Sequence, residues 1–327
     1  MKKAITIAVS LALIAMTNIG CRSTNNPESV KCKPIYGQLS VKGTQLVGED
    51  GNAVVLRGVS YGWHTWWPRF YNAETVKWFK DDWHCTVVRA AMGVEPDSSY
   101  LANPEKALRQ IQAVADAAID NGIYVIIDWH SHSLLSNEAN NFFGQMAQKY
   151  GKYPNIIWEI FNEPIDQPWD SIKSYSTRII NTIRQYDPNN IILIGSTHWD
   201  QDIHKVAESP LTGVDNIMYT VHYYADTHKQ WLRDRCDSAL SKGIPIFISE
   251  SGGGDASGDG KLNYTEWNNW TNWCEANKIS WLIWAVSDKL ETCSLLLPSA
   301  ASEGGWANAD LTECGKTTRD KIRSLNN

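Results

Sequence analysis

The sequence has no excess of basic residues, no CxxC pair and few phenylalanines, and each shortage narrows what the protein can do. Among its 327 residues, 30 Lys and Arg stand against 36 Asp and Glu, which gives a formal net charge of −6. This balance provides no basic footprint for nucleic acid. A hydrophobic content of 43% with 20% charged residues is ordinary for a globular chain. The length suits one large α/β domain or two small ones.

The cysteines have no spacing typical of a metal or redox centre. With Cys21 set aside, an even number remains, which permits disulfides in an exported protein. Cys293 and Cys314 bracket one loop and are the first candidates for a pair. The pairing is otherwise open among Cys32, Cys85, Cys236 and Cys274.

Tryptophan is abundant where phenylalanine is scarce. The chain holds 16 Trp and 13 Tyr against 6 Phe. Trp and Tyr combine a flat apolar ring with a polar group, which suits the binding of sugars. An aromatic-rich core gives the same composition, so composition alone leaves both interpretations open.

The N-terminal segment predicts export. Residues 1–20 contain a Lys-Lys start and an apolar stretch too short to span a membrane, as in a signal peptide. Gly20-Cys21 resembles a bacterial lipoprotein cleavage site, although Asn18 departs from the usual Leu, and it predicts a lipidated Cys21. Residues 21–36 are expected to form a tether before a domain at 37–327. The expected location is therefore the cell envelope, as a lipoprotein, or outside the cell.

Apolar runs typical of buried strands alternate with helical patterns along the rest of the chain. The expected strands are 53–60, 86–92, 124–130, 155–163, 191–196, 217–224, 245–251 and 280–287. The expected helices are 74–81, 104–121, 138–150, 170–186, 202–208, 229–242, 264–277 and 316–325. This strict alternation predicts an α/β fold with a single (β/α)8 TIM barrel.

Two details bear on that prediction. A doubly wound sheet is the runner-up, but it requires a Gly-rich phosphate loop after the first strand, and GVSYGWHTWW at 58–67 is not one. Residues 38–52 are expected to form a small β-hairpin at the barrel floor, with Asp50-Gly51 as its turn.

Polar and aromatic residues collect at the carboxyl ends of the expected strands. In a barrel all these ends meet at one mouth, where barrel enzymes carry their chemistry. The residues are Arg89, His130, Asn162, Glu163, His222, Tyr224, Glu250 and Trp284. Paired carboxylates such as Glu163 and Glu250 are the equipment of glycoside hydrolysis, at ~5 Å for retention or ~6.5–9.5 Å for inversion. The spacing in the sequence does not give that distance.

Taken in order, the motifs resemble those of glycoside hydrolase family 5, and within it the bacterial endo-β-1,4-glucanases, or cellulases. The motifs are RAAM (Arg89), IIDWH (His130), WEIFNEP (Asn162 and Glu163), HYY (His222 and Tyr224), ISE (Glu250) and SWLIWAVSDK (Trp284). The resemblance covers residues 36–325. It implies endo-acting, retaining hydrolysis of β-1,4-glucosidic linkages in cellulose and related β-glucans, with Glu163 as acid/base and Glu250 as nucleophile.

The resemblance also implies supporting roles. Arg89 would keep Glu250 ionised, Tyr224 would hydrogen-bond Glu250, and Asn162 would hold the sugar 2-hydroxyl. His222 would lie beside Glu163, His130 would contact the reacting sugar, and Trp284 would form the floor under it. As the acid, Glu163 needs a raised pKa, which burial and the negative Glu250 would supply.

Residues farther out are expected to bind other glucose units. The resemblance implies Trp66 on the non-reducing side, Trp199 on the leaving-group side, and Lys289 and Glu291 after the last strand. Many relatives carry a His in SSHG after the first strand; here His64 is shifted by two positions and is the candidate replacement. Many also carry Tyr after RAAM, where this chain has Gly93.

The sequence also allows other interpretations. His130 and His132 share a strand face, but no third ligand accompanies them, so a metal is not expected. No organic cofactor is expected either. Asp128 and Glu159 are expected to form hydrogen bonds behind the site. A β-mannanase or mixed-linkage glucanase is the alternative enzyme, and a non-catalytic glycan-binding lipoprotein is the alternative from another class. The expected partner is a β-glucan polysaccharide, with the protein a monomer.

Overall fold

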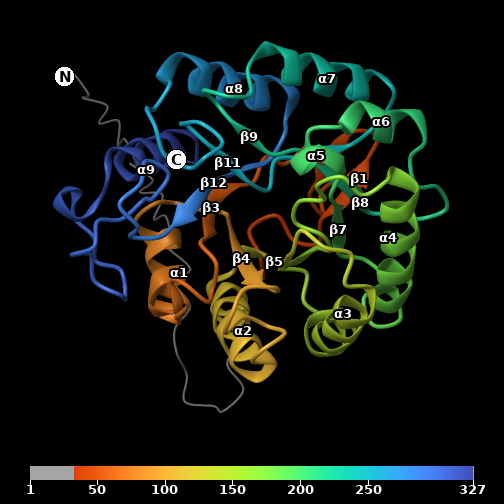
Figure 1. The fold of residues 1–327 in the computed structure, drawn as a ribbon, viewed down its shortest axis with the longest axis horizontal. Coiled ribbons are helices and arrows are strands. Elements are labelled where there is room, and N and C mark those ends of the chain that lie inside the picture. Colours follow the sequence, from red (N-terminus) through yellow and green to blue (C-terminus); the bar gives the residue numbers. More distant parts are fainter. Residues whose placement is uncertain (1–32, 327) are drawn as a thin grey trace, which may run out of the picture. The chain divides into compact units, whose positions relative to one another are not determined.

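The structure, a computed structural model, describes residues 33–326. Eight parallel strands form its centre (Figure 1): β3 (Arg57–Tyr61), β4 (Val87–Gly93), β5 (Tyr124–His130), β6 (Ile156–Glu159), β7 (Ile191–Ile194), β8 (Ile217–Thr220), β10 (Ile246–Phe247) and β12 (Trp281–Val286). They pair in the order β10-β8-β7-β6-β5-β4-β3-β12. A parallel bridge between Ile248 and Trp281 joins the two ends of this order. The predicted (β/α)8 barrel is confirmed.

Helices surround these strands (Figure 1): α1 (Ala73–Asp81), α2 (Pro104–Asn121), α3 (Ser136–Tyr150), α4 (Trp169–Arg184), α6 (Ile203–Glu208), α7 (Gln230–Ser241), α8 (Tyr264–Asn277) and α9 (Glu313–Leu325). A short turn, α5 (Thr197–Asp200), follows β7. The bounds of α2 match the prediction because both ends of the helix carry clear boundary signals. The Asn103 side chain accepts a hydrogen bond from the Lys106 N–H, and Gly122 ends the helix in the left-handed conformation.

An N-terminal hairpin closes the barrel floor. Its strands are β1 (Ser40–Lys42) and β2 (Gln45–Val47). Leu39 and Leu46 pack there with inward-facing side chains of the barrel strands, such as Ile126. The turn differs from the prediction: Gly43 supplies the positive φ that a two-residue hairpin turn needs. Asp50-Gly51 instead turns the chain back so that Ala53 bridges Val47.

Two expected strands are each divided in two at the mouth. Residues 217–224 form β8 and β9 (Tyr223–Tyr224), and residues 245–251 form β10 and β11 (Ser251–Gly252). β9 pairs with β11 in a separate small sheet. His222 lies between β8 and β9, and Glu250 lies between β10 and β11. Both residues are therefore outside the regular hydrogen-bonded strands, at the barrel mouth.

The cysteines of the described residues are not paired. The five within residues 33–326 are free and buried: Cys85, Cys236, Cys274, Cys293 and Cys314. The predicted pairing of Cys293 with Cys314 is therefore wrong; the Cys293 thiol donates to Glu291 Oε1 at 3.3 Å instead. Cys21, Cys32 and the predicted signal segment 1–20 lie outside the described residues. Over residues 33–326, no helix is long and apolar enough to cross a membrane.

Candidate active site

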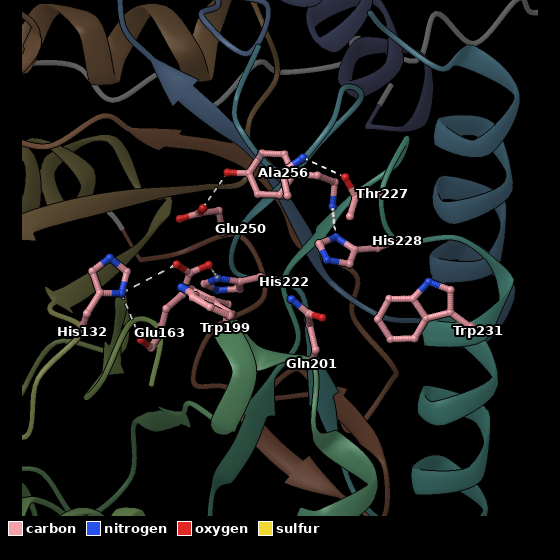
Figure 2. Close-up of a pocket in the computed structure, with 11 residues that line it drawn as sticks. His132, Glu163, Trp199, Gln201, His222, Thr227, His228, Trp231, Glu250 and Ala256 are labelled. Carbon is pink, nitrogen blue, oxygen red and sulfur yellow. Dashed lines mark hydrogen bonds and ion pairs between the residues drawn. The ribbon is translucent and has the colours of Figure 1, made fainter. Parts of the chain in front are cut away.

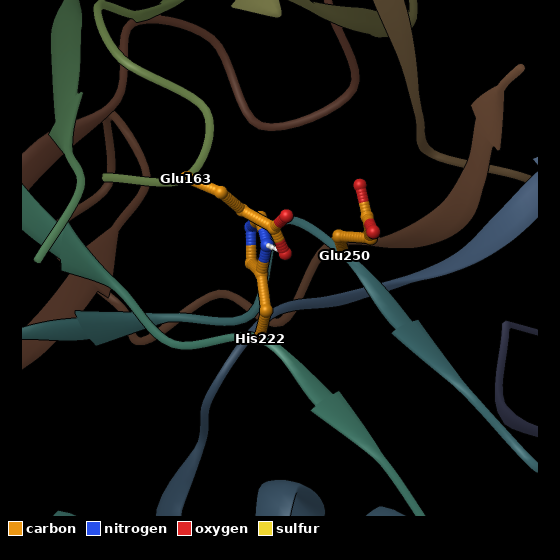
Figure 3. A group of neighbouring side chains, drawn as sticks. All are labelled: Glu163, His222 and Glu250. Atoms are coloured by element: carbon orange, nitrogen blue, oxygen red, sulfur yellow. Dashed lines mark hydrogen bonds and ion pairs between the residues drawn. The ribbon is translucent and has the colours of Figure 1, made fainter. Parts of the chain in front are cut away.

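Glu163 and Glu250 come together at the mouth of the barrel (Figure 3). Glu163 lies in the segment after β6, and Glu250 directly precedes β11. One carboxylate oxygen of each lies within 4.8 Å of the other. Carboxyl groups ~5–5.5 Å apart are typical of retaining glycosidases, whereas inverting enzymes hold them ~6.5–9.5 Å apart. The separation matches the retaining arrangement.

Two donors fix the orientation of Glu250. Arg89 Nη1 donates to Oε2 at 2.9 Å, and the Tyr224 hydroxyl donates to Oε1 at 2.7 Å. Burial raises the pKa of Glu250, and the negative charge of Glu163 adds to that rise, while His222 and Arg89 oppose it. Each oxygen of Glu250 therefore has a defined partner, and the carboxyl group holds a proton to a higher pH than usual.

Arg89 connects the polar groups beneath the site. It is fully buried, and its guanidinium donates to Glu159 Oε2 at 2.7 Å and to Asn162 Oδ1 at 2.6 Å. Asp128 Oδ2 lies 3.0 Å from Arg89 Nη2. Although burial opposes it, Arg89 lowers the pKa of Glu159 to about 2. Glu159 is therefore a permanent counter-charge, and the expected place of Asp128 and Glu159 behind the site is confirmed.

Asn162 offers the site a free donor. Its Oδ1 accepts from Arg89, and among the described residues its buried Nδ2 has no hydrogen-bond partner. Buried amides in native proteins are normally satisfied. An N–H group left unpaired next to two carboxylates suits the hydroxyl of a ligand.

Glu163 is held between two histidines. His222 Nδ1 lies 2.9 Å from Glu163 Oε1, and His132 Nδ1 lies 3.0 Å from the Glu163 carbonyl oxygen. The second ring nitrogen of His222 lies 3.0 Å from Ser249 Oγ and 3.4 Å from Asp200 Oδ2. The Glu163 side chain is 15% exposed, which leaves it accessible from the mouth.

The contact with His222 decides the charge of Glu163. Burial opposes a charged imidazole, but Asp200, Glu159 and Glu163 together raise the pKa of His222 well above its usual range. His222 in turn outweighs the effect of burial on Glu163 and lowers its pKa. The expected rise in the pKa of Glu163 is therefore wrong for the ligand-free site. The sequence motifs do not show how strongly an imidazole at hydrogen-bond distance lowers the pKa of Glu163.

His130 and Trp284 form a stacked aromatic pair. Their rings are stacked, with centroids 5.2 Å apart and an interplanar angle of 10°. His130 Nδ1 lies 2.7 Å from Asp128 Oδ2, and burial and Arg89 lower the pKa of His130 well below its usual range. A neutral imidazole stacked on an indole suits the apolar face of a sugar ring.

A cavity of about 540 Å³ opens beside the carboxylates (Figure 2). Its lining includes Glu163, His222, Tyr224 and Glu250, followed outward by Trp199, Gln201, His228 and Trp231. Trp199 and Trp231 are 42% and 40% exposed. Large exposed rings in a concave site are a binding surface.

The outer residues predicted from the resemblance lie in different places. Trp199 lines the cavity just described, and Trp66 is 54% exposed. Lys289 and Glu291 form an ion pair with each other, and Glu291 lines a separate cavity of about 370 Å³. The structure therefore does not bring Glu291 into the cavity that holds the two carboxylates.

His64 lies under its loop. It is buried, its Nδ1 accepts a hydrogen bond from the Gly93 N–H at 3.0 Å, and burial lowers its pKa to about 4. A neutral, buried ring of this kind holds the loop against β4. The assignment of His64 as a sugar contact gains no support from this position.

Several residues of the site were not predicted from the sequence, among them Trp63, Asp200 and Trp231. Trp63 packs edge-on against His130 at 4.4 Å and shares the WHTWW stretch with Trp66, which was the available signal. Asp200 follows β7 in STHWD, but its contact with His222 depends on the fold. Trp231 lies in α7, where nothing in the sequence separates it from a core tryptophan.

Among the described residues, only Glu163, His222 and Glu250 form a group that could hold a metal ion. Both ring nitrogens of His222 have hydrogen-bond partners, and both oxygens of Glu250 accept from donors. A bound cation would have to replace these hydrogen bonds. The arrangement suits proton transfer and nucleophilic attack better than metal binding.

The model of the cellulase family, glycosyl hydrolase family 5, matches residues 47–290. An endoglucanase of Clostridium saccharobutylicum is 38% identical over 333 residues, covering 99% of this chain and 73% of that protein. Endoglucanase 5 of Pectobacterium carotovorum subsp. carotovorum is 41% identical over 296 residues, covering 88% of this chain and 58% of that protein. The chain thus spans little more than half of the second relative.

Solved structures agree with these matches. A protein from Cytophaga hutchinsonii has a TM-score of 0.88 at 48% identity, over 89% of this chain and 96% of that one. The catalytic domain of Thermobifida fusca endoglucanase Cel5A has a TM-score of 0.84 at 30% identity, over 88% of this chain and 98% of that one. A variant of that domain has been solved in complex with cellotetraose.

Proposed function

The chain belongs to glycosyl hydrolase family 5, the cellulases, and on that premise we propose that it cleaves internal β-1,4-glucosidic bonds with Glu163 as acid/base and Glu250 as nucleophile. The observation that carries this proposal is the separation of the two carboxylates, within 4.8 Å at the mouth of the barrel. That separation supports a retaining double displacement over single-step inversion.

In the first step, Glu250 attacks the anomeric carbon while Glu163 protonates the glycosidic oxygen. The carbon–oxygen bond to the leaving sugar breaks as the bond to Glu250 forms, and the proton departs with the leaving sugar. Arg89 and Tyr224 hold the attacking carboxylate in one orientation. The free Nδ2 of Asn162 donates to the sugar 2-hydroxyl, a contact that strengthens in the transition state.

The proton comes from the Glu163–His222 pair. In the ligand-free site it lies on His222, which leaves Glu163 ionised. A bound sugar displaces water, and desolvation disfavours the two separate charges. The pair becomes neutral when the proton crosses the 2.9 Å Nδ1–Oε1 hydrogen bond, which converts Glu163 into the acid.

In the second step, Glu163 acts as the base. Glu250 is now a neutral ester, so Glu163 no longer faces a negative charge and its proton affinity falls. Glu163 takes a proton from water, the water oxygen attacks the anomeric carbon, and the ester bond breaks. Two inversions give overall retention.

The substrate is a linear β-glucan that crosses the mouth between the carboxylates. The reacting sugar lies against the stacked His130–Trp284 pair, and the leaving side lies over Trp199 and Trp231. Trp66 binds the non-reducing side. The cellotetraose complex of the Thermobifida fusca relative supports this class of ligand.

We also propose a cellular location and an oligomeric state for the enzyme. The enzyme is exported after removal of residues 1–20 and carries a lipid on Cys21, with residues 21–36 as a tether to the catalytic domain. It acts as a monomer. The apolar segment followed by Gly20-Cys21 supports this assignment.

Reducing-sugar release from carboxymethyl-cellulose tests the activity, with galactomannan as the comparison substrate. The parent protein should prefer the glucan. Glu163→Gln and Glu250→Gln should each lose activity while melting at an unchanged temperature. If the folded parent protein released sugar only from galactomannan, the substrate would be a mannan and not a glucan.

Azide rescue on an aryl cellobioside assigns the two roles. In Glu163→Ala, azide should attack the glycosyl-enzyme and give a β-glycosyl azide. In Glu250→Ala, azide should replace the missing carboxylate and give the α-glycosyl azide. The reverse pattern would exchange the roles of the two residues.

A further inference from the structure

His132 lies against the main chain of Glu163, two residues after the end of β5 (Figure 2). Its Nδ1 lies 3.0 Å from the Glu163 carbonyl oxygen and 3.9 Å from Glu163 Oε2. A carbonyl oxygen can only accept a hydrogen bond, so Nδ1 of His132 carries a hydrogen and is the donor. The His132 side chain is 33% exposed and lines the cavity that holds the two carboxylates.

The two carboxylate oxygens of Glu163 have different surroundings. Oε1 lies 2.9 Å from His222 Nδ1, whereas no hydrogen bond among residues 33–326 uses Oε2. A general acid must bring an oxygen within hydrogen-bond reach of the group that it protonates. Oε2 is the oxygen available for this task, and His132 lies beside it.

The segment that carries Glu163 has no regular structure of its own. β6 ends at Glu159 and α4 begins at Trp169, with neither helix nor strand between them. The Glu163 N–H donates to the Ser131 carbonyl oxygen over 3.4 Å, and the Glu163 carbonyl oxygen accepts from His132. Both main-chain groups of the proposed acid are therefore paired with the segment after β5, and the contact with His132 is the shorter one.

His132 is itself held from two sides. Glu95, in the segment after β4, accepts the Ser131 hydroxyl at 2.6 Å and the His132 N–H at 3.1 Å on one oxygen, Oε1. Gln167 donates to the His132 carbonyl oxygen at 2.8 Å and accepts the Ile165 N–H at 2.7 Å. The imidazole is therefore fixed between the segment after β4 and the segment that carries the acid. Side chains held in this way keep a site within a fraction of an ångström of its working geometry.

Resting on the proposed function, we infer that His132 is a positioning residue for the acid: its Nδ1–H fixes the main chain of Glu163 so that Oε2 meets the glycosidic oxygen of a β-glucan. His132 acts through Glu163 and exchanges no proton with the substrate. His222 holds the other oxygen, Oε1, so each histidine fixes a different part of the acid.

Aryl cellobiosides with different leaving groups test this role. Phenol needs a proton to leave and 2,4-dinitrophenol does not, so the ratio of kcat/KM for the phenyl to the dinitrophenyl substrate measures proton delivery. His132→Leu should lower this ratio about 10–100-fold, because a small displacement of a reacting group is costly. The dinitrophenyl substrate should react nearly as in the parent, which also shows that the variant is folded.

Two further variants separate the hydrogen bond from other properties of the ring. His132→Asn places an amide N–H where Nδ1–H stands and should retain most of the ratio. His204→Leu, on α6, replaces a histidine of similar exposure and should leave the ratio unaltered. An equal fall on both substrates, no fall, or a fall in His132→Asn as large as in His132→Leu would overturn the inference. A fall confined to cello-oligosaccharides would make His132 a contact of the leaving sugar and would overturn it too.

Glu95 provides an independent test through a double-mutant cycle. Glu95→Leu removes the acceptor that holds the His132 N–H, so it should lower the ratio in the same direction, whereas Glu95→Gln keeps an oxygen there and should retain it. In the His132→Leu background, Glu95→Leu should have little further effect. Additive losses would overturn the inference. A parent inactive on every aryl cellobioside would refute the proposed function itself, whereas an active parent with an unmoved ratio in His132→Leu refutes only the role of His132.

Discussion

Glu163 and Glu250 place carboxylate oxygens within 4.8 Å of each other, yet their pKa values shift in opposite directions. Burial acts on both. The difference arises because His222, whose Nδ1 lies 2.9 Å from Glu163 Oε1, lowers the pKa of Glu163, whereas burial and the charge of Glu163 raise the pKa of Glu250. The raised pKa of His222 therefore favours a proton on this ring, next to the proposed acid.

Replacing the acid should affect substrates according to their leaving group. Glu163→Gln should slow hydrolysis of carboxymethyl-cellulose about 10²–10⁴-fold, because the leaving sugar is no longer protonated. A dinitrophenyl cellobioside needs no such proton, so its first step should stay fast and its second should become slow. Stopped-flow absorbance should then show a burst of dinitrophenol. Equal slowing of both substrates without a burst would contradict the acid/base role.

The pH profile of kcat/KM should be bell-shaped, with both limbs displaced to higher pH. Glu250 must be ionised, and its raised pKa means that activity is lost as the pH falls through a value above the ordinary 4.5. The proton on His222 must be present, so activity is lost as the pH rises through a value above the ordinary 6.5. In His222→Asn, Glu163 alone holds the proton, so the basic limb should move to lower pH. An unmoved basic limb would exclude His222 as the proton store.

Asp200 should affect the basic limb of the pH profile of kcat/KM through its contact with His222. Its Oδ2 lies 3.4 Å from His222 Nε2, and Glu159, Glu163, Glu250 and Asp128 also act on this ring. Asp200→Asn should lower the pKa of His222 and move the basic limb down. Asp202→Asn is the matched control, because Asp202 bonds Lys205 and His198 instead. Equal shifts in the two variants would assign the effect to the loop as a whole.

The fold was predictable because each barrel strand is a buried apolar run and each helix is amphipathic. Pro104 at the first helical position and the stop at Asn121-Gly122 predicted the bounds of α2. The hairpin turn was missed because two glycine-containing turns, at Gly43 and Gly51, compete within a few residues, and only the strand register decides between them.

The identity of the site residues was more predictable than their electrostatics. Glu163 and Glu250 are marked by their positions at the ends of apolar runs, and Arg89 is marked by the RAAM motif; all three signals depend on local sequence. The charge of His222 depends on Asp200 of α5 and Glu159 of β6, which come from other parts of the chain. The close approach of the Trp63 ring, in the segment after β3, to Gly93 of β4 likewise joins two distant segments.

Asn162 should contribute through the sugar 2-hydroxyl. A hydrogen bond of this kind to a charged transition state is worth about 1.5–3 kcal/mol, or roughly 10–100-fold in rate. Asn162→Ala should lose that factor on an aryl glucoside and almost nothing on the 2-deoxy analogue. Comparison of kcat/KM for the two substrates separates the loss of this hydrogen bond from a loss of activity that affects both substrates equally. A loss of the same size on both substrates would contradict it.

The stereochemistry of the cleaved product tests the roles of the two carboxylates most directly. Proton NMR during the first minutes of cellopentaose hydrolysis distinguishes the anomers before they equilibrate. We expect the β-anomer to appear first and the α-anomer only later, by mutarotation, because Glu250 forms a covalent intermediate that water then resolves with the help of Glu163. Initial release of the α-anomer would show inversion and would contradict the assignment of Glu250 as nucleophile.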